Sequence, residues 1–218
     1  MSAKTVIFDM DGVLINSSLI YAHVIQHAFG RRGYNLPIDV IVARIIPHVE
    51  KWVDAVFPEN AAKNGILNEI TEEVRENVAK SSSDVQYQKN LEKILDELSK
   101  GNELFLITNS GSKLTGKVLE RNNLKRFFKR IITSDDGMGT KEKAITHIIH
   151  GNGLEGKDVV YIGDTERDVK SAREAGCKVI ILYTPFSWDY GKLEAIKNAE
   201  PDMIIESLDD LNRALKEV

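Results

Sequence analysis

The sequence predicts an α/β fold in which helices cover both faces of a parallel sheet. Three observations support this class: short apolar runs without alternation, helical stretches between them, and one long segment that has no strand pattern. Continuous apolar runs are typical of strands that are buried on both faces of a sheet. Strands that alternate with helices favour right-handed βαβ units and a doubly wound sheet of the Rossmann-like kind.

Five apolar runs have the character of buried strands, and a sixth lies near the end of the chain. They are VIF (6–8), ELFLIT (103–108), RIITS (130–134), DVVYIG (158–163), KVIIL (178–182) and, last, MIIE (203–206). Between these runs, three stretches have apolar residues at helical spacing. The three stripes are Leu91, Ile94, Leu95 and Leu98, then Ala144, Ile145, Ile148 and Ile149, then Val169, Ala172 and Ala175.

The segment from residue 16 to about residue 83 contains only helical patterns. Ile66, Ile70, Val74 and Val78 recur every four residues there, and three prolines divide the rest into short pieces. The polar run SSSD (81–84) is interpreted as the return to the sheet. We therefore predict an α/β core domain of residues 1–15 and 84–218 and an inserted all-helical cap domain of residues 16–83.

Composition excludes several classes of protein. The net charge of −4 gives no electrostatic reason to expect nucleic acid or an anionic membrane as a partner. The single cysteine, Cys177, cannot form an internal disulfide, which fits a reducing compartment. The start, MSAKTVIFDMDG, meets aspartates too early for a signal peptide or a membrane span. The expectation is a cytoplasmic protein.

Polar residues follow four of the predicted strands. Asp9 and Asp11 follow the first, and because residues two apart in an extended chain point to the same side, their carboxylates are expected to lie together. Two such charges are costly unless a cation or a shared proton lies between them. Thr108, Asn109 and Ser110 follow the second strand, Lys141 begins the helix after the third, and Asp164 and Asp168 follow the fourth.

All four groups are expected at the carboxyl edge of the sheet, where open α/β sheets bind ligands. Carboxylates, a hydroxyl and a lysine at one edge predict a site for Mg²⁺ and phosphate, because Mg²⁺ prefers hard oxygen ligands and shares phosphate oxygens. Thr108 and Lys141 are expected to hold the phosphate, helped by backbone N–H groups at the helix starts.

The stretches VIFDMDGVL, ITNS, Lys141 and GDTERD, in this order, resemble the four motifs of the haloacid dehalogenase-like (HAD) hydrolase superfamily. The resemblance spans nearly the whole chain and points to the phosphoglycolate phosphatase and β-phosphoglucomutase-like branch. It implies a central first strand and a helical cap inserted after it. Dehalogenases of the superfamily usually lack an aspartate at the position of Asp11, so its presence favours phosphoryl transfer.

The resemblance implies a role for each residue. Asp9 is the implied nucleophile, which takes the phosphoryl group as an aspartyl-phosphate, and Asp11 the general acid and base. Thr108, Asn109 and Lys141 bind phosphate oxygens. The implied Mg²⁺ site draws on Asp9, the Met10 carbonyl, Asp11, Asp164 and Asp168, the last of which orients metal-bound waters or Lys141.

Three other patterns were weighed and set aside. GNGLEGKD (151–158) matches two phosphate-loop patterns, but a helix precedes it and a strand follows, the reverse of what those loops require. His23 and His27 have a metal-binding spacing but no evident third ligand. The basic run LKRFFKR (124–130) is interpreted as a helix end in which Phe127 and Phe128 pack.

The sequence thus predicts a Mg²⁺-dependent phosphatase for a small phosphorylated metabolite, phosphoglycolate or a sugar phosphate, as a monomer or homodimer. Arg44, His48, Lys51 and Trp52 are candidates to select the substrate from the cap. Three alternatives stay open. They are a phosphomutase of the β-phosphoglucomutase type, a phosphonatase, which needs a cap lysine, and a non-catalytic binding protein of the same fold.

Overall fold

The computed structural model describes residues 4–42, 66–81 and 85–218. The chain packs as two compact units, the core unit of residues 1–16 and 86–218 and the helical unit of residues 17–85. The predicted change of domain after residue 15 and the predicted return at residue 84 fall near these limits. Each unit is described by itself.

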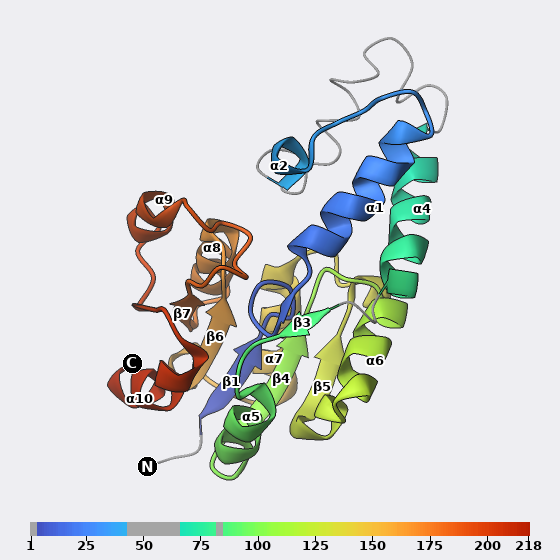
Figure 1. Ribbon diagram of the computed structural model, residues 1–218. Helices are drawn as coiled ribbons and strands as arrows, with labels where there is room; N and C mark the ends of the chain where they lie inside the picture. Colours follow the sequence, from blue (N-terminus) through green and yellow to red (C-terminus); the bar gives the residue numbers. More distant parts are fainter. Residues whose placement is uncertain (1–3, 43–65, 82–84) are drawn as a thin grey trace. The chain divides into compact units, whose positions relative to one another are not determined.

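The core unit is built on a six-stranded parallel sheet (Figure 1), with strand order β5-β4-β1-β6-β7-β8. β1 lies in the middle, between β4 and β6, and its four residues are all buried. The predicted fold class is confirmed. The strand bounds are β1 Thr5–Phe8, β4 Glu103–Ile107, β5 Phe128–Ile132, β6 Val159–Gly163, β7 Lys178–Leu182 and β8 Met203–Ile205.

In the basic run 124–130, Phe127 and Phe128 are buried as predicted, but the second half of the run is a strand. A 3₁₀ turn spans Leu124–Phe127, and β5 begins at Phe128, two residues before the predicted strand. Phe128 pairs with Leu104 of β4, and its ring packs edge-on against Phe8 at 6.2 Å between centroids. This contact with the central strand favours a strand at Phe128 over a helix. The spacing of residues in the sequence does not show the contact.

Helices cover both faces of the sheet, with α5 and α7 on opposite sides of it (Figure 1). Ile7, Phe105, Tyr161 and Val179 point to the face covered by α7 and α8 and form one buried cluster with them. Full burial of side chains of this size stabilises a fold by about 1.5–3 kcal/mol each. The helix bounds are α5 Leu91–Ser99, α6 Ser112–Arg121, α7 Lys141–Gly151, α8 Glu166–Glu174, α9 Leu193–Asn198 and α10 Leu211–Glu217.

In the helical unit, α1 (Ser18–Gly30) packs against α4 (Ile66–Lys80), and a short α2 (Ile38–Val40) follows α1. The predicted apolar stripe of α4 is confirmed at Ile70, Val74 and Val78, which are buried. The cap candidates Arg44, His48, Lys51 and Trp52 and most of the return segment 81–84 lie outside the described residues.

The two chain segments that join the units belong to a small antiparallel pair that the sequence did not predict. β2 (Ile15–Asn16) pairs with β3 (Gln86–Tyr87). The backbone N–H of Gln88 continues the pair by donating to the Leu14 carbonyl at 3.0 Å. Strands of two residues are too short to show a period in the sequence. The pair ties the end of the segment after β1 to the segment before α5.

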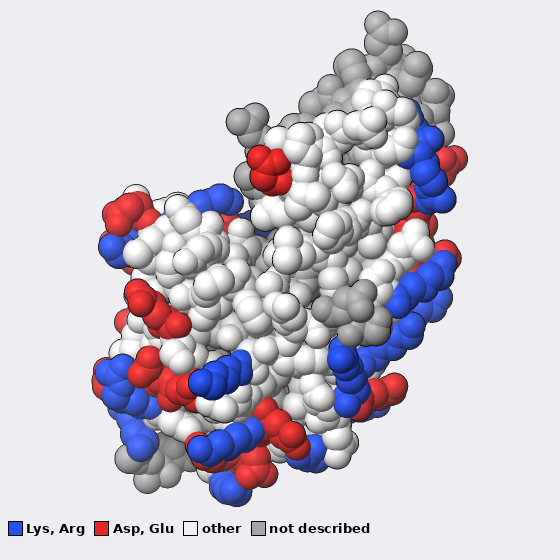
Figure 2. All heavy atoms as spheres, viewed as in Figure 1, with Lys and Arg blue, Asp and Glu red and all other residues white. Residues whose placement is uncertain are grey.

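In Figure 2, charged side chains of both signs lie beside one another along the lower part of the face, whereas its middle is mostly uncharged. Within the described ranges, none of the helices has the length and apolar character that crossing a membrane requires.

Candidate active site

Asp9 follows the last residue of β1, and its surroundings fix both carboxylate oxygens. The residue is 4% exposed, and its backbone N–H donates to the Ile162 carbonyl of β6 at 2.9 Å. One oxygen, Oδ1, accepts the N–H of Met10 at 2.7 Å. The other, Oδ2, accepts Lys141 Nζ in a short ion pair. A buried carboxylate at the end of the central strand is thus held in one orientation.

Lys141 is the first residue of α7, whose start is set by Thr140, a side-chain cap that accepts the N–H of Lys143 at 3.3 Å. The lysine lies between two carboxylates, Asp9 and Asp168, and Nζ is 2.7 Å from Asp168 Oδ1. Burial works to lower the pKa of Lys141, but the charges of Asp168 and Asp9 outweigh it and hold that pKa well above its usual range. The ammonium group therefore stays charged and ties β1 to α8.

Asp168 is committed to hydrogen bonds on both oxygens. Oδ2 accepts the Thr165 hydroxyl at 2.6 Å and the N–H groups of Thr165 and Asp164 at 3.0 and 3.2 Å, which closes a capping box at the start of α8. Oδ1 accepts Lys141 and the Tyr161 hydroxyl, the latter at 3.3 Å. Burial works to raise the pKa of Asp168, but Lys141 and these donors lower it below its usual value. Asp168 is an ionised anchor for Lys141.

Asp164 follows β6 and is 1% exposed. Its Oδ2 accepts the backbone N–H of Trp188, from the loop after β7, at 2.6 Å. Gly12 lies against the same carboxylate with φ +79°, and a Cβ on that glycine would collide with Asp164. A side chain at position 12 is therefore excluded twice, by the backbone conformation and by the carboxylate. Burial, followed by the negative charges of Asp168 and Asp9, raises the pKa of Asp164 well above its usual value.

The three carboxylates of Asp9, Asp164 and Asp168 offer ligand atoms within 4.8 Å of one another. Burial, with the charges of Asp168 and Asp11, raises the pKa of Asp9 to about 7 although Lys141 works in the opposite direction. One lysine does not balance three buried carboxylates. A set of hard oxygen donors with excess negative charge fits a divalent cation such as Mg²⁺. Because Asp168 already accepts five hydrogen bonds, Asp9 and Asp164 are the members with capacity left for an ion.

Asp11 does not belong to this group of three. Its Oδ2 accepts the hydroxyls of Thr108 at 3.1 Å and of Ser110 at 2.7 Å, both from the segment after β4. The other oxygen, Oδ1, is buried and has no hydrogen-bond partner among the described residues. Asp11 is thus turned toward the β4 edge, and the structure does not bring it to the three carboxylates that would hold a metal ion.

The predicted phosphate-binding residues line one cavity of the core unit. It has a volume of about 200 Å³, and Thr108, Asn109 and Lys141 contribute to its wall. Thr108 is 2% exposed, and its hydroxyl accepts the N–H of Ser110 at 3.0 Å while donating to Asp11. Asn109 is exposed beside it. The loop 133–140 with Gly137 and Gly139 forms the opposite wall.

Two parts of the sequence interpretation need correction. The Met10 carbonyl accepts the N–H groups of Leu14 at 2.9 Å and Ile15 at 3.2 Å, so both of its lone pairs are engaged and it offers little to a metal ion. Ser110 received no role, yet its hydroxyl contacts Asp11. Its position two residues after Thr108 at the end of a strand is a signal that the sequence contains.

The patterns set aside in the sequence have structural roles. In GNGLEGKD, α7 ends at Gly151 and β6 begins at Val159, so the order of elements is that of a helix exit. Cys177 is 3% exposed, and burial raises the pKa of its thiol to about 12. His23 and His27 are both exposed, and neither belongs to a metal-binding group in the part of the chain that is described.

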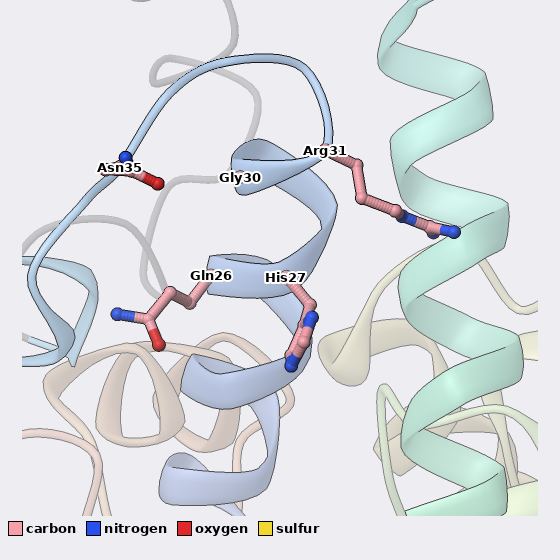
Figure 3. Close-up of a pocket in the computed structure, with 5 residues that line it drawn as sticks. All are labelled: Gln26, His27, Gly30, Arg31 and Asn35. Carbon is pink, nitrogen blue, oxygen red and sulfur yellow. The ribbon is translucent and has the colours of Figure 1, made fainter.

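A separate pocket lies in the helical unit at the end of α1 (Figure 3), and its volume is about 330 Å³. Its wall residues engage partners within that unit: Gln26 donates to the Leu36 carbonyl at 2.9 Å, and Arg31 pairs with Glu73. The pocket is lined by Gln26, His27, Gly30, Arg31 and Asn35.

The model of the family described as haloacid dehalogenase-like hydrolase matches residues 6–182. The chain is 27% identical to the phosphoglycolate phosphatase of Vibrio cholerae over 96% of each chain, and 25% identical to that of Shigella dysenteriae over 97% of this chain and 92% of the relative. A haloacid dehalogenase-like hydrolase of Streptococcus pneumoniae has a similar fold, with a TM-score of 0.80 at 23% identity over 98% of both chains.

The family match includes all four motif stretches in full and runs from Val6 of β1 to the end of β7 at Leu182. Together with the phosphatases among the relatives, it confirms the predicted class of enzyme, a phosphatase of this superfamily. The chain belongs to the haloacid dehalogenase-like hydrolases.

Proposed function

We propose that this protein is a Mg²⁺-dependent phosphatase that hydrolyses a small phosphorylated metabolite through an aspartyl-phosphate on Asp9. The observation that carries the proposal is the position of the Asp9 carboxylate, buried at the end of the central strand beside one lysine and two further carboxylates. A nucleophilic carboxylate has to be fixed, ionised and adjacent to positive charge that can receive a phosphoryl group.

Each residue has a role in this reaction. Asp9 attacks the phosphorus atom, and Asp11 gives a proton to the leaving oxygen and later takes one from the attacking water. Lys141, with Thr108 and Asn109, holds the phosphoryl oxygens. Asp9 and Asp164 would hold Mg²⁺, which when bound neutralises charge on the transferred group. Asp168 keeps Lys141 in position through the ion pair between them.

The names of the relatives guide the choice of substrate. The cavity of about 200 Å³ beside Lys141 is not lined by Asp9, so its volume sets no limit on the ester. Phosphoglycolate, the substrate in the names of the relatives, and a sugar phosphate are therefore the first esters to test. Both would place the phosphoryl group at Asp9 and leave a few atoms to be accommodated.

The test is phosphate release from a panel of small phosphate esters, with Mg²⁺ or with EDTA, for the wild type and for Asp9→Asn. We expect release that needs Mg²⁺ and is lost in the variant, whose fold is checked by circular dichroism. Turnover that survives in Asp9→Asn would overturn the mechanism. Transfer of the phosphoryl group to a second sugar in place of water would identify a phosphomutase.

Metal binding has an independent readout in the fluorescence of Trp188, whose backbone N–H donates to Asp164. In a Trp52→Phe background, Trp188 is the sole tryptophan. We expect its fluorescence to change with Mg²⁺ in a saturable way, and the change to be lost in Asp164→Asn. An unchanged signal together with EDTA-resistant turnover would argue against the metal.

A further inference from the structure

We propose that Ser110 is the positioning residue that orients Asp11 for proton transfer. The inference rests on the proposed phosphatase reaction and adds a residue to which that reaction assigned no role. It starts from an asymmetry in Asp11: two hydroxyls donate to Oδ2, whereas Oδ1 is buried and has no hydrogen-bond partner among the described residues.

The direction of the hydrogen bonds follows from Thr108. Its hydroxyl oxygen accepts the N–H of Ser110 at 3.0 Å, so its own hydrogen is free to point at Asp11 Oδ2, 3.1 Å away. Ser110 Oγ lies closer to the same oxygen, at 2.7 Å. Two donors engage both lone pairs of a carboxylate oxygen in the carboxyl plane. The two hydroxyls therefore hold the Asp11 carboxyl group by Oδ2.

Ser110 is itself held rigidly. The residue is 3% exposed, and its carbonyl accepts the N–H of Ser134 at 3.2 Å, which links the end of β4 to the turn after β5. Its hydroxyl thus starts from a fixed backbone position. A buried donor on a fixed backbone restricts the carboxylate to one orientation, which is the property that a proton donor in a strict geometry requires.

The proton balance of the reaction closes on Asp11. In the first step the Asp9 oxygen forms a bond to phosphorus, the bond from phosphorus to the leaving oxygen breaks, and the proton moves from the Asp11 carboxyl group to that oxygen. In the second step the oxygen of water bonds to phosphorus, the bond to Asp9 breaks, and the Asp11 carboxylate takes a proton from the water. The alcohol and inorganic phosphate leave, and Asp11 is again protonated.

The role predicts a dependence on the leaving group. An alkoxide is a poor leaving group and needs the proton, whereas p-nitrophenolate leaves as a stable anion. We expect Ser110→Ala to lower kcat/KM for the best alkyl ester of the panel by about 10- to 100-fold, the value of one hydrogen bond to a charged group. For p-nitrophenyl phosphate we expect a loss of less than about threefold.

Ser112→Ala is the matched control, two residues further along. Its hydroxyl contacts Asp135 at 2.6 Å, and the side chain is exposed at the start of α6, so no selective effect on the alkyl ester is expected. In an Asp11→Asn background, which by itself should cost about 10²–10⁴ in rate on the alkyl ester, Ser110→Ala should add nothing. Thermal unfolding of each variant shows whether the fold is kept.

Two outcomes would overturn the inference while leaving the phosphatase intact. The first is an equal loss with both substrates in Ser110→Ala, which indicates a structural role. The second is a loss no larger than that of Ser112→Ala in an enzyme for which Asp11→Asn does show the leaving-group dependence. Absence of phosphate release from every ester by the wild type would instead contradict the proposed function itself.

Discussion

Each unit of this protein contains a group of three charged residues. In each group, one residue forms ion pairs with two residues whose charge is opposite to its own. In the core unit Lys141 lies between Asp9 and Asp168, and the side chains are 13%, 5% and 1% exposed. In the helical unit Glu73 of α4 lies between Arg31 and Arg32 of the α1 end, and the arginines are 62% and 23% exposed. The two groups look alike as lists of ion pairs and differ in burial.

Burial changes what a charge group does. Arg31 is mostly exposed, so water screens its pair with Glu73, and exposed pairs contribute about 1 kcal/mol or less. The core group is buried away from water, so each charge depends on its partners for stabilisation. A third buried carboxylate, Asp164, accepts the backbone N–H of Trp188. A sequence search for charged residues finds both groups, whereas burial singles out the one whose cost calls for a functional explanation.

The largest expected effect comes from removing the bridging lysine. Lys141→Met leaves Asp9 and Asp168 buried without a cation, and we expect a loss of about 3–5 kcal/mol in the free energy of unfolding at pH 8 in EDTA. The loss should shrink toward pH 5, where Asp9 takes up a proton. Urea denaturation at the two pH values checks this. A loss below about 1 kcal/mol at pH 8 would mean that the core group is no more demanding than a surface pair.

The pH dependence of stability sharpens the same contrast. Asp9, with its pKa raised to about 7, binds a proton in the folded state that the unfolded chain releases near its ordinary value, and Asp164 acts in the same direction. The folded metal-free protein holds the extra protons, so its stability falls as pH rises from about 4 to about 7. Relative to Asp9→Asn, the wild type should lose a few kcal/mol over this window.

Urea denaturation of both proteins in EDTA across the window measures this difference. Addition of Mg²⁺ at pH 7.5 should recover stability in the wild type and little in Asp9→Asn. A difference between the two proteins that stays constant with pH would show that Asp9 is ionised throughout.

Gly12 tests how tightly the site is packed. Gly12→Ala places a side chain at φ +79° and against the Asp164 carboxylate, and we expect a loss of about 1–3 kcal/mol in stability. Activity should fall with it, because Asp164 has to move. Gly33→Ala in the helical unit is the control, since φ is +86° there and nothing lies within 4 Å of the added carbon. Equal losses would mean that backbone strain alone is responsible.

The smallest effect is expected in the helical unit. Burial works to raise the pKa of Glu73, but hydrogen bonds from Arg31 and Arg32 outweigh it and lower that pKa. Its stabilising contribution is present above the ordinary pKa of a glutamate and is lost as pH falls through the lower folded value. Arg31→Met should cost about 1 kcal/mol or less at pH 7 and should leave phosphate release unchanged, because Arg31 is the exposed member of the group. A loss equal to that of Lys141→Met would remove the distinction between the two groups.

The sequence by itself determined the fold class, the strands of the parallel sheet and the edge at which the chemical groups meet. Period and polarity carry that information, since a buried parallel strand has to be continuously apolar and its polar ends meet at one edge. β7 (Lys178–Leu182) was predicted to the residue, and the motif order was enough to indicate the superfamily.

The tertiary structure decided which group contacts which. Asp168 turned toward Lys141, Asp11 turned toward Thr108 and Ser110, and the Met10 carbonyl was engaged by two backbone N–H groups. These outcomes depend on hydrogen bonds between residues 27 to 99 positions apart or on local turn geometry, to which one-dimensional periodicity is blind. The spacing of residues fixes the edge of the sheet that a side chain reaches, and packing in three dimensions fixes the direction in which its atoms point.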